Sequence, residues 1–174
     1  MSTEPYRITV VCLGNICRSP MGEAVLRDRL EAAGLSDRVV VDSAGTGDWH
    51  IGHPADQRAH ATLVDAGYEL DHRARQINPT WMAGIDLLLA MDEANYRNLE
   101  VMLEESGLDD DALPQLRMMR SYDPDLAHLD APHADLVVPD PYFGESDGFV
   151  DSLAMIEKAA DGLVDGLLDQ FNER

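Results

Sequence analysis

The residues with the clearest chemical potential lie near the N-terminus, where Cys12 and Arg18 enclose five residues and Ser19 follows. An ionised thiol is a nucleophile, and an arginine side chain can hold two oxygens of a phosphate at once. Gly14 and Asn15 are residue types that tolerate a positive backbone φ, which lets successive N–H groups point into one small volume. The spacing therefore predicts an anion-binding loop that carries a cysteine nucleophile.

The elements around this loop favour the same interpretation. Residues 8–11 are apolar and β-branched and predict a buried strand, while Ser19-Pro20 predicts a helix start with Ser19 as its N-cap. A loop between a strand and a helix N-terminus collects free N–H groups and the positive end of the helix dipole. This field favours the thiolate form of Cys12. Ser19 is expected either to donate its hydroxyl to that thiolate or only to cap the helix.

Two other interpretations of the loop stay open at this point. A chain with twelve arginines can contain this spacing by chance, and a buried cysteine at a strand end is more often inert. A zinc site built on Cys12 and Cys17 would need two further ligands with a different spacing, so no metal is expected. The histidine pairs that could supply the two further zinc ligands are His50 with His53, and His128 with His133.

Strand and helix patterns alternate along the rest of the chain. After the first strand, further strands are predicted at 39–41, 85–90 and 115–121, and helices at 19–34, 54–66, 93–106 and 149–171, with a turn at 42–45 and a loop at 123–140. This alternation predicts an α/β fold of three layers, in which helices flank a four-stranded parallel sheet. Ligands of such sheets bind outside the carboxyl ends of the strands, and Cys12 is the first such end.

The composition limits the class of protein. The chain has 174 residues, 13 Lys and Arg against 33 Asp and Glu, a net charge of −20 and 45% hydrophobic residues. It predicts one domain over residues 1–174 and excludes a disordered acidic tail. The negative charge argues against nucleic acid and against an anionic membrane as partners. Two cysteines make no disulfide framework, and no signal peptide or membrane span is visible, so a cytoplasmic location is expected.

Residues 11–21, Val-Cys-Leu-Gly-Asn-Ile-Cys-Arg-Ser-Pro-Met, closely resemble the phosphate loop of the low-molecular-weight protein tyrosine phosphatases. Further motifs resemble those of the same family and follow in its order, from residue 8 to the C-terminal helix. They are Asp-Ser-Ala-Gly-Thr-Gly-Asp-Trp at 42–49, His-Arg-Ala-Arg-Gln at 72–76, Met-Asp-Glu at 91–93, Ser-Tyr-Asp-Pro at 121–124 and Asp-Pro-Tyr-Phe-Gly at 140–144.

The resemblance implies three catalytic residues. Cys12 would form a phosphocysteine intermediate, Arg18 would clamp the phosphate and stabilise the transition state, and Asp140 would protonate the leaving phenol. The residues alone leave the acid open, because Asp123 also stands in an Asp-Pro pair and either pair is a turn former. Only the motif around Asp140 favours it.

The remaining site residues are also implied by the resemblance. The phosphate would be bound by the loop, with Trp49 and Tyr142 as aromatic walls at the entrance. A hydrogen-bond network of four residues would support the loop: Asn15, Ser19, Ser43 and His72. The phosphate-binding loop itself comprises Leu13, Gly14, Asn15, Ile16, Cys17, Arg18 and Ser19.

The implied activity is metal-independent hydrolysis of phosphotyrosine monoesters, with no cofactor. The substrates would be phosphotyrosine-bearing proteins or small aryl phosphates, and the chain would be a monomer or a weak homodimer. Tyr142 would be a phosphorylation site, with a tyrosine kinase as partner. Apart from the resemblance, Cys17 stands five residues from Cys12, so it is expected either to be a disulfide partner of Cys12 under oxidation or to be only a packed loop residue. Two alternatives remain: an arsenate reductase of the same fold, which needs cysteines beyond Cys17, and a non-catalytic phosphoprotein-binding module.

The charge is unevenly distributed, and this predicts a salt effect. Residues 1–91 carry 12 acidic and 8 basic side chains, whereas residues 92–174 carry 21 and 5. We expect moderate salt to raise kcat/KM for acidic phosphopeptides, because it screens their repulsion, and basic flanking residues to be preferred. Steady-state kinetics at two ionic strengths measure this. A clear loss of rate with salt, or a preference for acidic flanks, would contradict the expectation.

Overall fold

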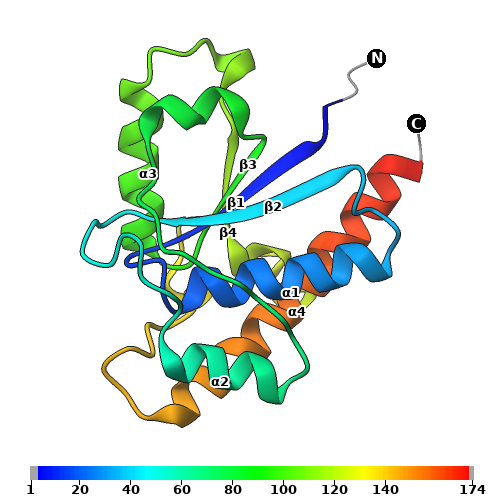
Figure 1. The fold of residues 1–174 in the computed structure, drawn as a ribbon. Coiled ribbons are helices and arrows are strands. Elements are labelled where there is room, and N and C mark those ends of the chain that lie inside the picture. Colours follow the sequence, from blue (N-terminus) through cyan, green and yellow to red (C-terminus); the bar gives the residue numbers. More distant parts are fainter. Residues whose placement is uncertain (1–3, 173–174) are drawn as a thin grey trace.

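The computed structural model describes residues 4–172 and contains one sheet of four strands. The strands are β1 (Tyr6–Cys12), β2 (Val39–Gly45), β3 (Leu87–Ala90) and β4 (Gln115–Met118). They lie in the order β2-β1-β3-β4, and every pairing is parallel (Figure 1). The predicted α/β fold with a four-stranded parallel sheet is confirmed.

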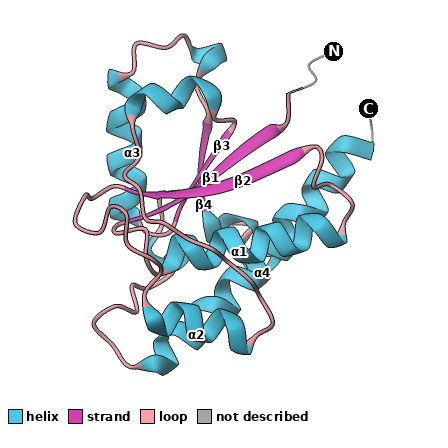
Figure 2. Ribbon diagram, viewed as in Figure 1, coloured by secondary structure: helices cyan, strands magenta, loops and turns pink. Residues whose placement is uncertain are grey.

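Helices cover both faces of this sheet (Figure 2). They are α1 (Arg18–Ala32), α2 (Gln57–Asp65), α3 (Glu93–Glu105) and α4 (Ser146–Asn172). One buried cluster joins the sheet to α1, α2 and α4, and a second joins it to α3. Among residues 4–172, no helix is long and apolar enough to cross a lipid bilayer.

The alternation of side chains along β1 explains the two clusters. Ile8 and Val10 belong to the cluster with α1 and α4, whereas Val11 belongs to the cluster with α3. Successive side chains of a strand point to opposite faces, and a parallel sheet covered on both faces needs apolar residues on both. Cys12 continues the first set and so lies on the α1 side at the carboxyl end of the strand.

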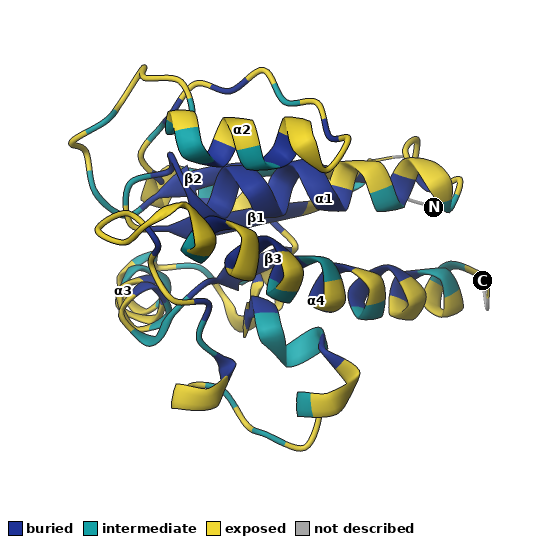
Figure 3. Ribbon diagram, turned by 90° about the horizontal axis from the view of Figure 1, so that it is seen from below, coloured by how far each residue is buried: buried dark blue, intermediate teal, exposed yellow. Residues whose placement is uncertain are grey.

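Helix α1 is buried along its first half, from Arg18 to Leu26 (Figure 3). It packs against the sheet and also contacts α2 and α4. A Cβ atom on Gly22 would lie 3.0 Å from side-chain atoms of both Val10 and Met91, so glycine allows α1 to approach the sheet closely. This approach brings the N-terminus of α1 next to the end of β1.

Two predictions about local structure were wrong. Residues 42–45 form no turn, because β2 continues beside β1 up to the pair of Cys12 with Gly45. The Thr9 hydroxyl also donates to Asp42 Oδ1 at 2.6 Å, which holds this turn-forming residue in the ladder. Ser19 is not the N-cap of α1: the helix begins one residue earlier, after Cys17, and no side chain caps it.

Other boundaries shift by a few residues. Strand β4 is shorter than predicted, since Met119–Tyr122 forms a 3-10 helix, and β3 begins at Leu87. The predicted loop at 123–140 contains two further 3-10 turns, Pro124–Leu126 and Ala134–Leu136. Helix α1 ends at Ala32, and Gly34 follows it with a φ of 74°, as expected for a residue that ends a helix.

The contact between α4 and the segment that follows β4 depends on Gly162. A Cβ atom there would overlap the backbone oxygen of Tyr122, and backbone cannot move aside as a flexible side chain can. We therefore expect Gly162→Ala to lower the free energy of unfolding by about 1–3 kcal/mol. Gly166→Ala, in the same helix with no atom near the added Cβ, should instead raise it by about 0.5–1 kcal/mol. Urea denaturation measures both, and equal effects would contradict this account of the packing.

Candidate active site

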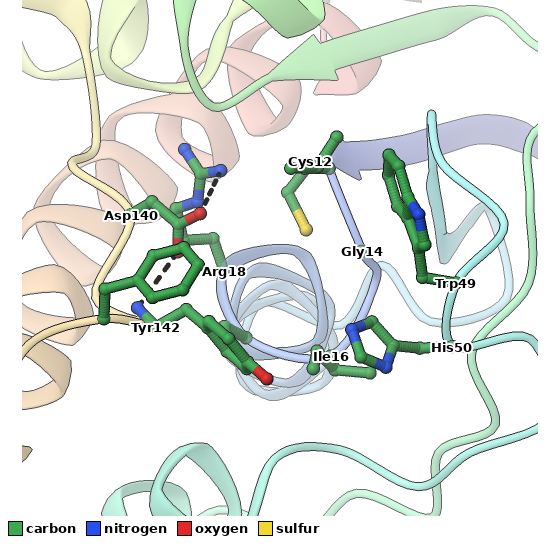
Figure 4. A pocket seen from close by; sticks show the side chains of 11 residues that line it. Cys12, Gly14, Ile16, Arg18, Trp49, His50, Asp140 and Tyr142 are labelled. Atoms are coloured by element: carbon green, nitrogen blue, oxygen red, sulfur yellow. Dashed lines mark hydrogen bonds and ion pairs between the residues drawn. The ribbon is translucent and has the colours of Figure 1, made fainter.

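A cavity of about 210 Å³ opens at the carboxyl end of β1. The Cys12 thiol points toward its centre, with Trp49 and His50 on one side and Asp140 and Tyr142 on the other (Figure 4). These five residues come from three separate parts of the chain, and the fold brings them together. The predicted nucleophile, acid and aromatic walls therefore line one cavity.

The floor of the cavity is the loop from Cys12 to Arg18. Asn15 has a φ of 55° and so adopts the left-handed conformation that its residue type tolerates, whereas Gly14 does not adopt a positive φ. The end of β2 supports the loop from below. A Cβ atom on Gly45 would lie 2.6 Å from the Leu13 backbone oxygen, so a side chain there would displace the loop.

The side chain of Asn15 organises the hydrogen bonds beneath the loop. The backbone N–H of Arg75 donates to Asn15 Oδ1 at 2.9 Å, which fixes the orientation of the amide. The amide nitrogen then donates to Ser19 Oγ at 2.8 Å and to Ser43 Oγ at 3.0 Å. His72 Nε2–H donates to the backbone oxygen of Asn15 at 2.6 Å. The four residues implied to support the loop are thus in direct contact.

The direction of these hydrogen bonds determines which group the hydroxyls of Ser19 and Ser43 donate to. Ser19 Oγ accepts from Asn15, so its own hydrogen is free to donate to Cys12 Sγ, 3.0 Å away. Ser43 likewise donates to Glu23 Oε1 at 2.8 Å, and that buried carboxylate pairs with Arg27 at 3.0 Å. The network therefore delivers a hydroxyl hydrogen to the Cys12 sulfur.

The second cysteine of the loop has a different environment. Burial raises the pKa of the Cys17 thiol well above its usual range, and the nearby charges of Asp56, Cys12 and Asp140 raise it further. Cys17 is consequently a neutral thiol at physiological pH. No disulfide joins it to Cys12 in this structure, where both cysteines are free.

Arg18 is 2% exposed, and its guanidinium faces the cavity. Nη1 donates to Asp92 Oδ2 at 2.8 Å and to the Val138 backbone oxygen at 3.0 Å. Burial on its own lowers the pKa of Arg18, but the negative charges of Cys12, Asp92 and Asp140 outweigh it, so the pKa is raised and the group stays cationic. Nε finds no hydrogen-bond partner among residues 4–172. The Nε–H is therefore a buried donor that the described chain leaves unused.

The structure also distinguishes the two candidate acids. Asp140 Oδ2 lies 3.6 Å from Arg18 Nη2, and the Tyr142 N–H donates to its other oxygen at 3.1 Å. Asp123 does not line the cavity: it is buried, caps the turn Pro124–Leu126 and pairs with Lys158 at 3.8 Å. Of the two Asp-Pro pairs, only the second places its carboxylate at the site.

Aromatic side chains form the rim of the cavity. Trp49 is 68% exposed and lies over Gly47, where any side chain would overlap the indole ring. Opposite it, the Tyr142 and Phe143 rings pack edge to face with centroids 4.8 Å apart. The centroid of the His50 ring is 6.2 Å from that of Tyr142. The rim is therefore largely apolar and aromatic.

Sequence reasoning missed several residues that the structure brings to this site or its support. Arg75 and Asp92 could have been found, since both lie in motifs already recognised. His50 and Phe143 are direct neighbours of predicted wall residues. Glu23 carries no comparable signal, because an acidic residue in a helix is ordinarily exposed.

The zinc alternative finds no support in the geometry. Within the described range 4–172, no group of three or more His, Cys, Asp or Glu side chains is placed to hold a metal ion. His50 and His53 contact each other with ring centroids 5.8 Å apart, and His128 is exposed on the 123–140 loop.

A cysteine above a loop of backbone amides and beside a buried arginine, at the end of the first strand of a parallel sheet, defines an oxyanion-binding cysteine site on an α/β fold. A model of the family "Low molecular weight phosphotyrosine protein phosphatase" matches residues 7–173. The chain belongs to this family.

Individual relatives agree with the family. A low molecular weight protein-tyrosine-phosphatase of Streptomyces coelicolor is 47% identical over 97% of this chain and 98% of its own. The crystal structure of a protein tyrosine phosphatase from Entamoeba histolytica matches with a TM-score of 0.82 and 29% identity, covering 95% of this chain and 98% of that one. A Drosophila arginine phosphatase matches with a TM-score of 0.81 and 28% identity, covering 92% and 96%.

The contact of Ser19 with Cys12 can be tested chemically. We expect Ser19→Ala to slow alkylation of Cys12 by iodoacetate about 10-fold at mildly acidic pH, because a hydrogen bond to a charged group is worth about 1.5–3 kcal/mol. Ser106→Ala is the control, since its hydroxyl bonds Leu103 at the end of α3. Mass spectrometry follows the modified peptide. An unchanged rate in Ser19→Ala would show that Ser19 does not act on the thiolate.

Proposed function

We propose that this protein hydrolyses phosphotyrosine monoesters, of proteins or of small aryl phosphates, through a phosphocysteine intermediate. The observation that carries the proposal is the unpaired Nε–H of the buried Arg18 at the same cavity as the Cys12 sulfur. A buried donor without a partner is costly, and a phosphate oxygen would satisfy it. Asp92 and Val138 hold only Nη1, so Nε and Nη2 can bind two oxygens together.

In the first step, a phosphate dianion would sit on the loop with its oxygens bound by backbone N–H groups and Arg18. The Cys12 sulfur attacks phosphorus, and the bond from phosphorus to the phenolic oxygen breaks. Asp140 gives its proton to that oxygen, so the leaving group departs as a neutral phenol. Binding of the phosphate would also turn Arg18 Nη2 from Asp140 toward the substrate.

In the second step, water would attack the phosphocysteine. Asp140, now a carboxylate, accepts a proton from the water, and the sulfur leaves as a thiolate. The Ser19 hydroxyl stabilises this thiolate as it forms, as it does in the free enzyme. Fixed dipoles and one arginine thus provide the charge stabilisation that phosphoryl transfer requires.

The shape of the cavity supports an aryl substrate. Trp49 and Tyr142 stand on opposite sides of the Cys12 sulfur, so a phenyl ring between them would place its phosphate on the loop. Aromatic pairs add about 0.5–1.5 kcal/mol beyond the area that they bury. A serine phosphate is shorter and would leave these walls without contact.

The other functions are less well supported. An arsenate reductase would need a cysteine relay, and the chain has only Cys12 and Cys17. A pure binding module would not need an acid at the position of Asp140. Phosphoarginine is a substrate to test, given the arginine phosphatase among the structural neighbours.

The expected partners and location follow from the same proposal. The physiological partners would be phosphotyrosine-bearing proteins, with a tyrosine kinase acting on Tyr142, which is 37% exposed. The protein would act in the cytoplasm as a monomer or weak homodimer. Cys17, a free thiol that lines the same cavity, would be a disulfide partner of Cys12 once an oxidant such as peroxide has converted Cys12 to a sulfenic acid, with water as the leaving product.

The proposal is tested by replacing the nucleophile. Cys12→Ser should abolish turnover of phosphotyrosine, because a serine hydroxyl is not ionised at neutral pH, and should retain binding of inorganic phosphate. Phosphate release measures turnover, and calorimetry measures binding. Undiminished hydrolysis by Cys12→Ser would end the proposal. If the wild-type protein hydrolysed phosphoarginine and not phosphotyrosine, phosphoarginine would replace phosphotyrosine as the proposed substrate.

A further inference from the structure

An ion pair of Asp56 and Arg58 lies between the Cys12–Arg18 loop and the segment that carries Asp140. The backbone N–H of Asp56 donates to the Ile16 backbone oxygen at 2.8 Å, which ties this residue to the loop. The Asp56 carboxylate caps α2 by accepting from the Arg58 N–H at 2.8 Å. One end of the ion pair is therefore anchored to the floor of the cavity.

The guanidinium of Arg58 lies between the Asp56 carboxylate and the segment that carries Asp140. Nε and Nη2 each donate to the Asp56 carboxylate at 3.1 Å. On its other side, Nη2 donates to the Tyr142 backbone oxygen at 2.9 Å and Nη1 to the Gly144 oxygen at 3.1 Å. Only a planar group with donors on both sides can make these contacts together, and a lysine cannot.

Packing and charge hold this guanidinium in place. Its central carbon lies 4.7 Å from the centroid of the buried Phe149 ring and 5.6 Å from that of Tyr142. Burial alone would raise the pKa of Asp56, but the hydrogen bonds from Arg58 outweigh it and keep this pKa below its usual range. Asp56 is consequently an anion at physiological pH, and the pair is always charged.

Pro141 is buried, but the rest of the segment held by Arg58 makes few polar contacts with other elements. Tyr142, Phe143 and Gly144 are exposed, and within the described chain the hydrogen bonds that residues 141–144 receive from another element both come from Arg58. Tyr142 is the critical residue, because its carbonyl oxygen is held by Arg58 while its N–H donates to Asp140 Oδ1. A continuous path thus runs from the loop through Asp56, Arg58 and Tyr142 to the Asp140 carboxylate.

We propose that Arg58 is a positioning residue for Asp140: it sets the distance of the general acid from the Cys12–Arg18 loop. Arg58 does not line the cavity, so it acts through Tyr142 and not on the substrate. The proposal rests on the proposed function, in which Asp140 protonates the leaving oxygen.

This role has a signature that simple destabilisation lacks. Protonation matters most for a basic leaving group such as tyrosine, with a pKa of about 10, and less for the more acidic p-nitrophenol. Loss of Arg58 should therefore affect the two substrates unequally in kcat/KM, which reports the step in which the phenol leaves.

The experiment compares Arg58→Met with wild type on phosphotyrosine and on p-nitrophenyl phosphate. We expect kcat/KM to fall on the order of 10- to 100-fold for phosphotyrosine and less than about 3-fold for p-nitrophenyl phosphate, since general acids contribute about 10²–10⁴. Arg58→Lys, which keeps the charge but not the fork, should show the same unequal loss. Arg97→Met, which removes an exposed ion pair with Glu93 on α3, should change neither rate.

A double-mutant cycle with Asp140→Asn shows whether the effect passes through the acid. In that background Arg58→Met should add less than about 2-fold on either substrate, because no acid remains to be positioned. Equal losses on both substrates, or an undiminished effect in the Asp140→Asn background, would overturn the role of Arg58 while leaving the proposed function intact. A wild-type protein inactive on both substrates would overturn the proposed function and this inference with it.

Discussion

The burial of the Arg18 guanidinium is the constraint on which the site depends. A charged group at 2% exposure loses most of its hydration, which costs several kcal/mol unless other groups replace the water. The compensating groups come from separate elements: Cys12 from β1, Asp92 from the start of α3, and Val138 and Asp140 from the long connection to α4. Holding this cation therefore requires that the sheet, α3 and the acid-bearing segment be assembled around the N-terminus of α1.

The same requirement explains how a very acidic protein can present a site for an anion. The net charge of −20 lies mostly after residue 91, but the carboxylates next to the cavity are engaged with cations. Asp92 and Asp140 face Arg18, and Asp56 faces Arg58. Recognition at short range thus relies on fixed N–H groups and Arg18, while the surrounding surface repels anions at long range.

Much of the fold and the core of the site could be predicted because the relevant signals are local. The strand before Cys12, the alternation of strands and helices, and the loop with Asn15 at a positive φ are properties of neighbouring residues. Local signals failed where distant partners compete with them. Asp42 favours a turn, yet the ladder with β1 and the hydroxyl of Thr9 keep it in β2. Ser19 favours an N-cap, yet Asn15 and Cys12 engage its hydroxyl within the first turn.

The sequence by itself determined the loop, its nucleophile and arginine, and the order of the strands and helices along the chain, because each depends on residue type and short spacing. Only the tertiary structure decided which of two Asp-Pro acids reaches the cavity, and it placed Asp123 in an ion pair with Lys158 elsewhere. It also revealed Glu23, Asp92 and Arg58 as supports of the site. Their roles depend on contacts between residues 20 to 86 positions apart, and no local pattern encodes such distances.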